Sequence, residues 1–511
     1  MMNSADMLVS DFATLPDLIR AHAREQGGKT ALIAEGGAID YQRLDRLMDR
    51  IATALQRYGA RQGQAVAIVA ASSIEYVAVF LGALRAGCVA APLAPSSTPE
   101  ALAAMIADCG APILFLDGDA EKALGRQEIN AIRIRLDTDA FDALLDRENE
   151  NPAAVTIAPD DGFNIIYSSG TTGTPKGIVQ SHAMRWAHIN RNAAAGFGDA
   201  VTMIATPLYS NTTLVSFLPT LGWGGSAVLM KKFDARGFLE LAQASRATHA
   251  MLVPVQYQRI MALPDFDSFD LSSFRFKTCT SAPFSAELKA DIVARWPGLL
   301  VEYYGMTEGG GTCLLVANQH PDKLNTVGQP VEGHDIRLID DDGNEVPRGE
   351  MGEVVGRSPA MMTGYHGRSD ATAAAEWFDA AGRRYIRHGD VGRFDADGFL
   401  TLLDRKKDLI ISGGFNIYPT DLEAVLARHP AVADCSVIGI PSEAWGETPV
   451  GFYVPHTGVD ASVADILACT NQQLGKTQRL AALHAIDELP RSAIGKVLKR
   501  ELRDRLTGTM P

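Results

Sequence analysis

The spacing of apolar residues predicts alternating strands and helices in the first part of the chain. Five apolar residues recur at the helical interval and form one face of an amphipathic helix: Leu44, Leu47, Met48, Ile51 and Leu55. Short apolar runs then alternate with helical patterns, which gives strands at 66–70, 89–93 and 113–116 and helices at 74–84 and 102–109. Such alternation is typical of a mostly parallel sheet covered by helices.

The pattern changes in the second half of the chain. Between about 325 and 405, turn dipeptides such as Asp342-Gly343 and Asp397-Gly398 separate short β runs, which indicates a small antiparallel barrel or sheet. From Leu409 a unit of about a hundred residues follows, with a helix at 421–427 and strands at 435–440 and 450–454. We therefore expect an α/β chain with a large N-terminal domain of layered sheets, a small β-barrel subdomain and a small α+β C-terminal domain.

Composition and charge restrict the classes of function. The chain has 511 residues, of which 46% are hydrophobic, so it can bury more than one core. Its net charge of −14 leaves no basic surplus for nucleic acid or an anionic membrane. No run of eighteen apolar residues and no signal-peptide pattern occurs, and we expect a cytoplasmic protein. The six dispersed cysteines are expected to be buried small hydrophobes, not disulfides or metal ligands.

The segment 167–177 reads Tyr-Ser-Ser-Gly-Thr-Thr-Gly-Thr-Pro-Lys-Gly and follows the apolar run 163–166. Glycines let backbone N–H groups approach an anion, the hydroxyls add donors, and Lys176 adds a cation. The composition therefore predicts a loop that binds phosphates, with a solvated Ser/Gly linker as the alternative. It is not a Walker A loop, because G-x-x-x-x-G-K-[ST] does not occur in the chain.

Four further segments accompany this loop in order: Tyr-Gly-Met-Thr-Glu at 304–308, Tyr-Ile-Arg-His-Gly-Asp at 385–390, Asp-Arg-Lys-Lys-Asp-Leu-Ile-Ile-Ser-Gly-Gly at 404–414 and Pro-Arg-Ser-Ala-Ile-Gly-Lys at 490–496. Together the five segments closely resemble the motifs of the adenylate-forming enzymes, which include acyl-CoA synthetases, peptide-synthetase adenylation domains and beetle luciferases. The resemblance spans nearly the whole chain. It implies that ATP and a carboxylic acid form an acyl-adenylate and pyrophosphate, and that coenzyme A then releases acyl-CoA and AMP, with Mg²⁺ as the metal.

The resemblance also implies a domain division. Residues 1–404 would form the adenylation domain that binds ATP and the acid, and 405–408 a hinge with Lys407 at the pivot. Residues 409–511 would form a mobile lid domain. In the family, the lysine corresponding to Lys496 enters the active site for adenylation and leaves when the small domain rotates. Without the resemblance, Lys496 would be read as a solvated surface residue and 404–408 as a surface turn.

Further site residues follow from the resemblance. Thr307 corresponds to a threonine that reaches the α-phosphate, Glu308 to the magnesium-associated glutamate, Tyr304 to the ring that stacks on adenine, and Asp390 to the carboxylate that accepts the ribose hydroxyls. On residue chemistry alone, Glu308 could begin a helix, Tyr304 could belong to the core, and Asp390 could be a turn residue. The other residues implied to contact ATP or AMP are Ser168, Ser169, Gly170, Thr171, Thr172, Gly173, Lys176, Ser281, Ala282, Pro283, Gly305 and Arg405.

The walls of the acid pocket are implied in the same way, and they are Tyr209, Ser210, Asn211, Tyr303, Gly309 and Gly310. Tyr303 would narrow one wall and the glycines would open another. Ser210 stands where many CoA ligases have a histidine, so a relative's specificity does not transfer simply. Because no lysine or arginine lies in these segments to neutralise a second carboxylate, we expect a monocarboxylic acid with an apolar body, either aromatic or short-to-medium aliphatic.

Coenzyme A contacts are implied for Gly413 and Gly414, which would line the pantetheine tunnel, and for Trp445, for which a core position is the alternative. Two other functions remain open: an enzyme that loads an acyl group onto a carrier protein, and a nucleotide-binding sensor with a degenerate site. The expected partners are the acid, ATP and CoA, with no nucleic acid and no membrane span, in a monomer or homodimer. Lys496 also resembles sites that lysine acylation silences, which would make a lysine acetyltransferase a regulatory partner.

Overall fold

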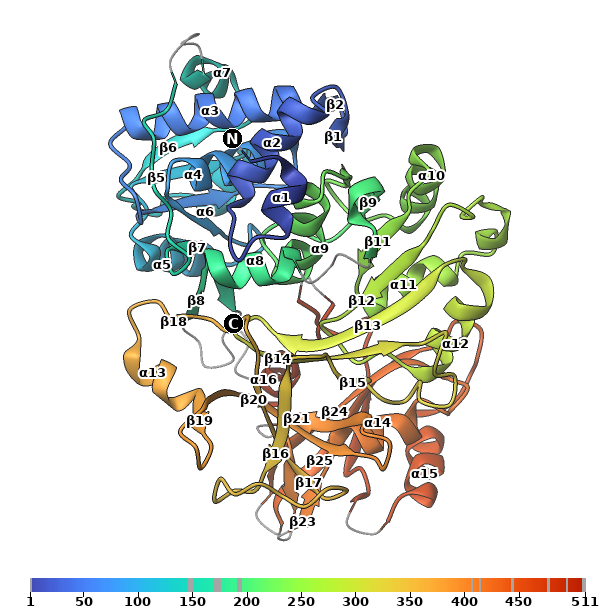
Figure 1. The fold of residues 1–511 in the computed structure, drawn as a ribbon. Coiled ribbons are helices and arrows are strands. Elements are labelled where there is room, and N and C mark those ends of the chain that lie inside the picture. The colour runs from blue at the N-terminus through green and yellow to red at the C-terminus, as the bar shows by residue number, and fades with distance from the viewer. Residues whose placement is uncertain are drawn as a thin grey trace. The chain divides into compact units, whose positions relative to one another are not determined.

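The computed structural model in Figure 1 describes residues 2–145, 151–168, 176–190, 195–405, 408–412, 415–442, 445–475, 478–492 and 495–507. The chain divides into two compact units. The first comprises Met1–Leu324, Pro330–Asp335 and Arg357–Ile386, and the second comprises Asn325–Gln329, Ile336–Gly356 and Arg387–Pro511. The second unit thus begins before the predicted hinge, and the boundary at 404 stays a prediction. Lys407 lies outside the described residues.

The first unit contains a seven-stranded sheet in the order β18-β8-β7-β4-β3-β5-β6. Its strands are β3 (Ala65–Val69), β4 (Val89–Pro92), β5 (Ile113–Leu116), β6 (Ile132–Arg135), β7 (Gly162–Ser168), β8 (Lys176–Ser181) and β18 (Gly364–Tyr365). Strands β3 to β7 pair in parallel, whereas β8 is antiparallel to β7 and β18. The helices along this part of the chain are α3 (Tyr41–Arg57), α4 (Ile74–Arg85), α5 (Pro99–Cys109), α6 (Gly118–Leu124), α7 (Asp139–Leu145) and α8 (His182–Asn190). The predicted parallel sheet and its first helices are therefore confirmed.

Capping residues explain where several of these helices begin. The side chains of Ser73, Thr98 and Asp117 accept hydrogen bonds from backbone N–H groups in the first turns of α4, α5 and α6. Such bonds satisfy donors that have no partner within the helix. Each cap follows a buried strand, so the chain turns from strand to helix at the carboxyl end of the sheet.

A nine-stranded sheet forms the second layer of the first unit, in the order β15-β14-β13-β12-β11-β9-β10-β1-β2. Its strands are β1 (Thr30–Ala34), β2 (Gly37–Asp40), β9 (Val201–Ile204), β10 (Ser226–Leu229), β11 (His249–Leu252), β12 (Phe276–Cys279), β13 (Leu299–Met306), β14 (Gly309–Val316) and β15 (Gln329–Pro330). The accompanying helices are α1 (Ser4–Leu8), α2 (Leu15–Glu25), α9 (Asn211–Gly222), α10 (Ala235–Ser245), α11 (Pro254–Met261), α12 (Ala286–Arg295) and the short 3₁₀ helices η2 (Phe197–Asp199) and η3 (Phe266–Ser268). Figure 1 shows α11 and α12 against β12 and β13.

Buried residues show how the layers of the first unit pack. Val66 and Ile68 of β3 belong to a core that also includes residues of α3, α4, α9 and β10, so this core joins the two sheets. Ala67 and Val69 point to the opposite core, which α5 and α6 cover, as the alternation of side chains along a strand requires. A third core lies between α10, α11, α12 and the strands β9 and β11.

The remaining described segments form two further sheets. One has the order β16-β17-β20-β19 with β21 paired to β20, and it comprises β16 (Asp335–Ile339), β17 (Met351–Arg357), β19 (Glu376–Phe378), β20 (Arg384–Phe394) and β21 (Leu400–Arg405), with α13 (Ser369–Ala374) between β18 and β19. The predicted turns at Gly343 and Gly398 occur there, each with a backbone bond to an aspartate three residues earlier. The small β subdomain is thus an antiparallel sheet over its described pairs.

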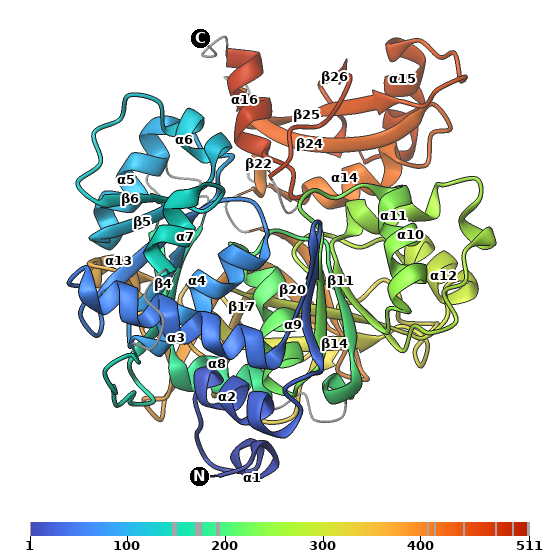
Figure 2. The same ribbon diagram turned by 90° about the horizontal axis from the view of Figure 1, so that it is seen from above.

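The C-terminal segment is a compact α+β unit. Its sheet has the order β23-β22-β25-β24 with β26 paired to β25, and its elements are β22 (Ile410–Ser412), β23 (Phe415–Ile417), α14 (Pro419–Leu426), β24 (Val432–Ser442), β25 (Gly446–Pro455), α15 (Val463–Gln473), β26 (Ala482–Ala485) and α16 (Lys499–Thr507). Figure 2 shows β24 and β25 with these three helices. The cluster around Ile466 includes residues of α14 and α15, whereas Leu502 of α16 packs in a separate cluster with Ile438.

One expectation about the cysteines is wrong. Four of the six are buried and all are free thiols, but Cys435 is only partly buried and Cys469 is exposed. Helix α15 buries Ile466 and Thr470, and Cys469 lies on its solvent side. Within the described part of the chain, no helix is both long and apolar enough to cross a membrane.

Candidate active site

The predicted catalytic residues Thr307 and Glu308 form the turn of a β-hairpin. Strands β13 and β14 pair in antiparallel fashion up to Met306 and Gly309, so the turn has two residues. Gly309 has a φ of +88°, a conformation that L side chains rarely adopt. Glu308 therefore does not begin a helix, and the helix alternative is excluded. Because β13 is parallel to β12, the turn lies at a carboxyl edge of strands, where α/β sheets place their ligands.

The predicted phosphate loop joins the ends of two paired strands. Ser168 at the end of β7 is opposite Lys176 at the start of β8. Ser169, Gly170, Thr171, Thr172 and Gly173 lie outside the described residues. The ammonium of Lys176 lies 5.1 Å from the centroid of the Tyr365 ring. The phenol of Tyr365 donates a hydrogen bond of 2.8 Å to Oε1 of Glu308. The structure thus brings Lys176 and Glu308 together at Tyr365, a residue that the sequence analysis missed.

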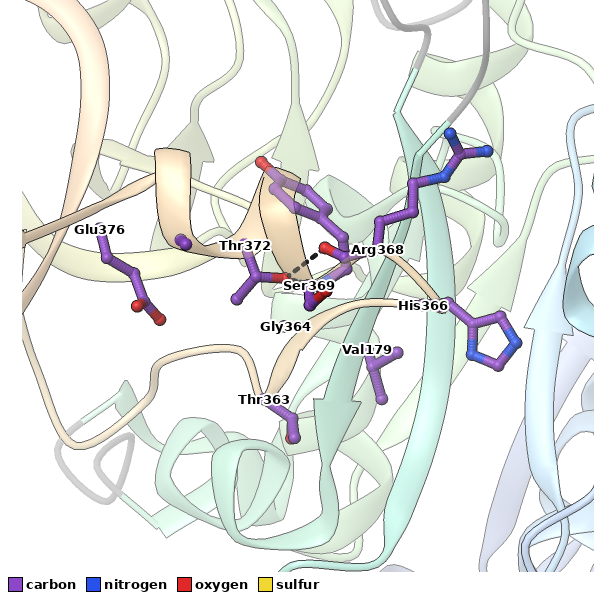
Figure 3. Close-up of a pocket in the computed structure, with 11 residues that line it drawn as sticks. Val179, Thr363, Gly364, His366, Arg368, Ser369, Thr372 and Glu376 are labelled. Carbon is purple, nitrogen blue, oxygen red and sulfur yellow. Dashed lines mark hydrogen bonds between the residues drawn. The ribbon is translucent and has the colours of Figure 1, made fainter.

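A surface cavity of about 540 Å³ opens beside this point (Figure 3). Most of its lining residues come from the segment 363–369, and Figure 3 shows Arg368 and Glu376 on opposite sides of it. Arg368 forms an ion pair of 3.4 Å with Asp108, which accepts a hydrogen bond of 2.7 Å from the hydroxyl of Tyr167. Tyr167 lies at one end of the predicted phosphate-binding segment 167–177, and Lys176 lies near the other end. The segment containing Tyr365 and Arg368 is therefore linked to both ends of the loop.

A buried glutamine connects the turn at Thr307 and Glu308 to the predicted acid pocket. Gln180 of β8 is fully buried. Its Nε2 donates a hydrogen bond of 2.7 Å to the carbonyl of Thr307 and one of 3.4 Å to Oδ1 of Asn211. Its Oε1 accepts hydrogen bonds from Nδ2 of Asn164, at 2.8 Å, and from Arg185. Sequence reasoning missed these contacts, because Gln180 belongs to none of the five motifs.

Arg185 of α8 extends the network further into the core. Its guanidinium is fully buried and donates a hydrogen bond of 2.9 Å from Nε to Oδ1 of Asn164. It also lies over the ring of Phe163, 5.9 Å from the centroid. Burial lowers the pKa of Arg185 from 12.5 to about 9, which still leaves it charged at neutral pH. Hydrogen-bonded networks of this kind hold their members rigidly.

The predicted acid-pocket residues differ in their contacts and burial. Ser210 is the N-cap of α9, and its hydroxyl accepts a hydrogen bond of 3.3 Å from the backbone N–H of Thr212. The Ser210 side chain therefore caps a helix. Tyr209 is half-buried, and burial raises its pKa although a hydrogen bond with Ser96 opposes the shift. In β13, Tyr303 is half-buried and lies opposite Leu314 of β14.

Ser281 has a strained backbone. It follows β12 with a φ of +84°, which is uncommon for a residue other than glycine. Its hydroxyl is within 2.5 Å of the hydroxyl of Thr212 in α9. Strain of this kind persists where the surroundings fix it, and it occurs often at ligand sites. Ala282 and Pro283 follow, and their expected contact with the purine stays a prediction. The expected nucleotide contacts of Gly305 and of the buried Tyr304 also stay predictions.

In the second unit, two residues predicted to contact the ribose meet. Asp390 of β20 and Arg405 of β21 are opposite each other in antiparallel strands, and the Arg405 Nε lies 3.3 Å from the Asp390 Oδ1. Asp390 is therefore a strand residue, and the turn alternative is excluded.

The predicted residues of the C-terminal domain are described only in part. Gly413 and Gly414 lie outside the described residues. Trp445 is 59% exposed, so it is not a core residue. Lys496 is half-buried. Its backbone N–H donates to the Ser492 hydroxyl at 3.2 Å, and its carbonyl accepts from the Ser492 N–H at 2.8 Å.

The residues present fit a magnesium ion that is bound together with a nucleotide. No group of three or more His, Cys, Asp or Glu side chains within the described ranges could hold a metal ion. Mg²⁺ commonly takes one or two carboxylates and completes its shell with phosphate oxygens and water. Glu308 can supply one carboxylate oxygen, because the Tyr365 hydrogen bond goes to the other.

The chain is similar to known proteins over most of its length. The family of AMP-binding enzymes matches residues 19–366, and the C-terminal domain of AMP-binding enzymes matches residues 421–496. Feruloyl-CoA synthase from an Amycolatopsis species is 33% identical over 491 residues, which cover 94% of this chain and 97% of that protein. The fatty acid–[acyl-carrier-protein] ligase ScoC from Streptomyces coeruleorubidus is 31% identical, with 97% of each chain covered.

Among solved structures, ATP-bound MatB from Rhodopseudomonas palustris matches with a TM-score of 0.86 and 28% identity, over 97% of this chain and all of that one. The fold expected from the motifs, a large N-terminal and a small C-terminal domain, is confirmed by this likeness. The family match covers well over half of the chain. The chain therefore belongs to the AMP-binding enzymes, the adenylate-forming superfamily that its five motifs resemble.

Proposed function

We propose that the chain is an AMP-forming acyl-CoA ligase. A carboxylic acid displaces pyrophosphate from ATP to form an acyl-adenylate, and the thiol of CoA then displaces AMP to give an acyl-CoA. The observation that carries the proposal is the meeting of Lys176 and Glu308 at Tyr365, beside the strand ends that flank the phosphate loop. The CoA ligases among the relatives support the same reaction.

The first half-reaction brings two anions together. The carboxylate attacks the α-phosphorus while the bond to pyrophosphate breaks, and each like-charge pair at 4 Å costs about 4 kcal/mol at an effective dielectric of 20. Lys176 would bind the β- and γ-phosphates, and Glu308 would hold Mg²⁺, which supplies positive charge against the departing pyrophosphate. Thr307 lies next to Glu308 in the same turn, where its hydroxyl would reach the α-phosphate.

The second ammonium would come from Lys496. We infer that the C-terminal domain, 409–511, turns about Lys407 and brings Lys496 to the carboxylate and the α-phosphate for adenylation only. The two hydrogen bonds between Ser492 and the backbone of Lys496 support a fixed presentation of the side chain. Acetylation of Lys496 would remove the charge and stop this step.

Lys496→Ala should therefore slow acyl-adenylate formation by at least about 10²-fold, the order lost with one preorganised donor. Thiolysis of supplied acyl-adenylate should stay close to the wild-type rate. The two half-reactions are measured separately, as pyrophosphate release and as acyl-CoA formation from synthetic acyl-adenylate. An equal loss in both would contradict the assignment of Lys496.

For the acid we propose a monocarboxylate with an apolar body. Tyr209 and Tyr303 would offer apolar surface, and Ser210 is engaged as a helix cap. The buried Arg185 donates to Asn164 and Gln180, so it does not serve a second carboxylate. Relatives that act on aromatic acids, named feruloyl-CoA synthase and indoleacetate–CoA ligase, support an aromatic body.

A carrier-loading enzyme is the second candidate, because one relative is named a fatty acid–[acyl-carrier-protein] ligase. One assay separates the two. Purified protein, ATP and Mg²⁺ are incubated with a panel of aromatic and aliphatic acids, and pyrophosphate release is followed with and without CoA. Sustained turnover that requires CoA supports the acyl-CoA ligase and identifies the acid. Adenylate that accumulates regardless of CoA would overturn it in favour of carrier loading.

A further inference from the structure

Lys176 and Glu308 come from different sheets of the first unit, and one side chain contacts both. Lys176 begins β8 of the seven-stranded sheet, whereas Glu308 is in the turn after β13 of the nine-stranded sheet. Tyr365 places its ring 5.1 Å from the Lys176 ammonium and its hydroxyl 2.8 Å from the Glu308 carboxylate. The position of the Tyr365 side chain therefore determines the arrangement of the Lys176 ammonium relative to the Glu308 carboxylate.

The backbone around Tyr365 is fixed on the side of β8. Tyr365 lies in β18, which pairs with β8 at Ile178 and Val179. On either side of β18, the Thr363 N–H donates to the Val179 carbonyl at 3.0 Å and the His366 N–H donates to the Gly177 carbonyl at 2.7 Å. The segment consequently moves with the strand that carries Lys176.

The same segment is fixed on the side of Glu308. The Met362 N–H donates to the Glu308 carbonyl at 2.8 Å. A Cβ on Gly309 would lie only 2.1 Å from the carbonyl oxygen of Ala360, so the two backbones touch because residue 309 is a glycine. With its backbone held between both sheets, the Tyr365 side chain has little freedom to leave either charge.

The chemistry of the phenol suits both contacts. The hydroxyl is the donor in its hydrogen bond with the Glu308 carboxylate, because an ionised carboxylate can only accept. A hydrogen bond to Oε1 orients the carboxylate and leaves Oε2 for a cation. The face of the ring attracts the Lys176 ammonium through its quadrupole.

We propose that Tyr365 is a positioning residue for adenylation, and this inference rests on the proposed function. Its hydroxyl orients Glu308 toward the magnesium ion of MgATP, and its ring holds Lys176 ready for the same phosphates. The two contacts act on different reactants, so they can be separated experimentally. The hydroxyl governs the response to Mg²⁺, and the ring governs affinity for ATP without metal.

Two variants test the proposal. Tyr365→Phe removes the hydroxyl and keeps the ring, whereas Tyr365→Leu removes both. Tyr41→Phe is the matched control, because it deletes another hydrogen-bonded tyrosine hydroxyl, one that donates to the Gly225 carbonyl at 2.6 Å. Calorimetry measures ATP binding with EDTA and at a series of free Mg²⁺ concentrations, and pyrophosphate release with an accepted acid is followed over the same series. Thermal melting checks that all variants are folded.

For Tyr365→Phe we expect the Mg²⁺ concentration at half-maximal response to rise about tenfold or more, the usual effect of losing a partner of a metal-binding carboxylate. Its ATP affinity in EDTA should equal that of the wild type. Tyr365→Leu should show the same change in Mg²⁺ response and should in addition bind ATP in EDTA about threefold or more weakly. Tyr41→Phe should match the wild type in both its Mg²⁺ response and its ATP affinity in EDTA. A wild-type Mg²⁺ response in Tyr365→Phe, or an equal shift in Tyr41→Phe, would overturn the proposal. Because calorimetry needs no turnover, it decides the role of Tyr365 even if no acid in the panel reacts.

Discussion

The hydrogen bonds of Gln180 predict that one buried amide affects both the stability of the fold and the rate of adenylation. In Gln180→Leu, a side chain of similar size loses one hydrogen bond to the charged Arg185 and two short ones, with Asn164 and with the Thr307 carbonyl. A hydrogen bond to a charged group contributes about 1.5–3 kcal/mol and a neutral one about 0.5–1.5 kcal/mol. Burial of the more hydrophobic leucine side chain offsets part of this loss. We therefore expect the free energy of unfolding to fall by about 2–4 kcal/mol.

For a unit of several hundred residues, this change corresponds to a melting temperature roughly 3–6 °C lower. The rate should fall for a separate reason. The Thr307 carbonyl loses its donor, so the turn that carries Glu308 is free to shift, and a displacement of about 1 Å near reacting groups can cost on the order of 10² in rate. We expect pyrophosphate release to slow by about tenfold or more at a temperature at which the variant is fully folded.

Gln256→Leu is the matched control. Gln256 is also a buried glutamine of the first unit, and its amide bonds the Ala205 carbonyl at 2.9 Å and the Val253 N–H at 3.1 Å. Both variants are compared by thermal melting and by pyrophosphate release at saturating ATP, Mg²⁺ and acid. Gln256→Leu should lower the melting temperature and keep the wild-type rate. A Gln180→Leu enzyme that melts early yet reacts at the wild-type rate would refute the reasoning, as would an equal loss of rate in both variants.

Two further predictions concern stability. Burial lowers the pKa of His182 and of His249 from 6.5 to about 4, so the unfolded chain binds more protons than the folded chain between these values. The free energy of unfolding should thus fall as the pH drops from 6.5 to 4, by about 3 kcal/mol for each histidine. His249→Gln should flatten this dependence in urea denaturation at a series of pH values, and an unchanged slope would contradict the assignment. Lys289, whose side chain is 2% exposed, forms a buried ion pair with Glu302. Lys289→Met should cost about 3–5 kcal/mol because it leaves a buried charge without a partner, and adding Glu302→Leu should restore most of the loss. A double variant as unstable as the single one would show that the pairing is not the cause.

The spacing of apolar residues predicted individual strands and helices, because these depend on residues that are close in sequence. The apolar run 66–70 indicated β3, and the helical spacing from Leu44 to Leu55 indicated α3, because the interval between apolar residues shows which face of an element is buried. The expectation that all cysteines are buried was wrong for Cys469, since cysteine's usual preference for the core says nothing about which face of α15 it occupies.

The contacts that organise the site could not be predicted in this way. Gln180 and Thr307 are 127 residues apart in the chain, and Tyr365 and Glu308 are 57 residues apart. Such pairs meet only because two sheets pack together, and a lone Gln or Tyr carries no periodic signal. The motifs indicated which residues carry charge, but the neutral side chains that hold those charges became visible only in the folded chain.

The close approach at Gly309 limits how substrate choice can be re-engineered. A methyl group there would collide with the Ala360 carbonyl, and the φ of +88° disfavours any side chain as well. A glycine at position 309 is thus required for the close packing of the Gly309 and Ala360 backbones, although Gly309 is also a predicted wall of the acid pocket. Libraries designed to accept a larger or smaller acid should vary Tyr209 and Tyr303 and keep residue 309 constant, since most replacements there would be lost to misfolding before any new activity could be selected.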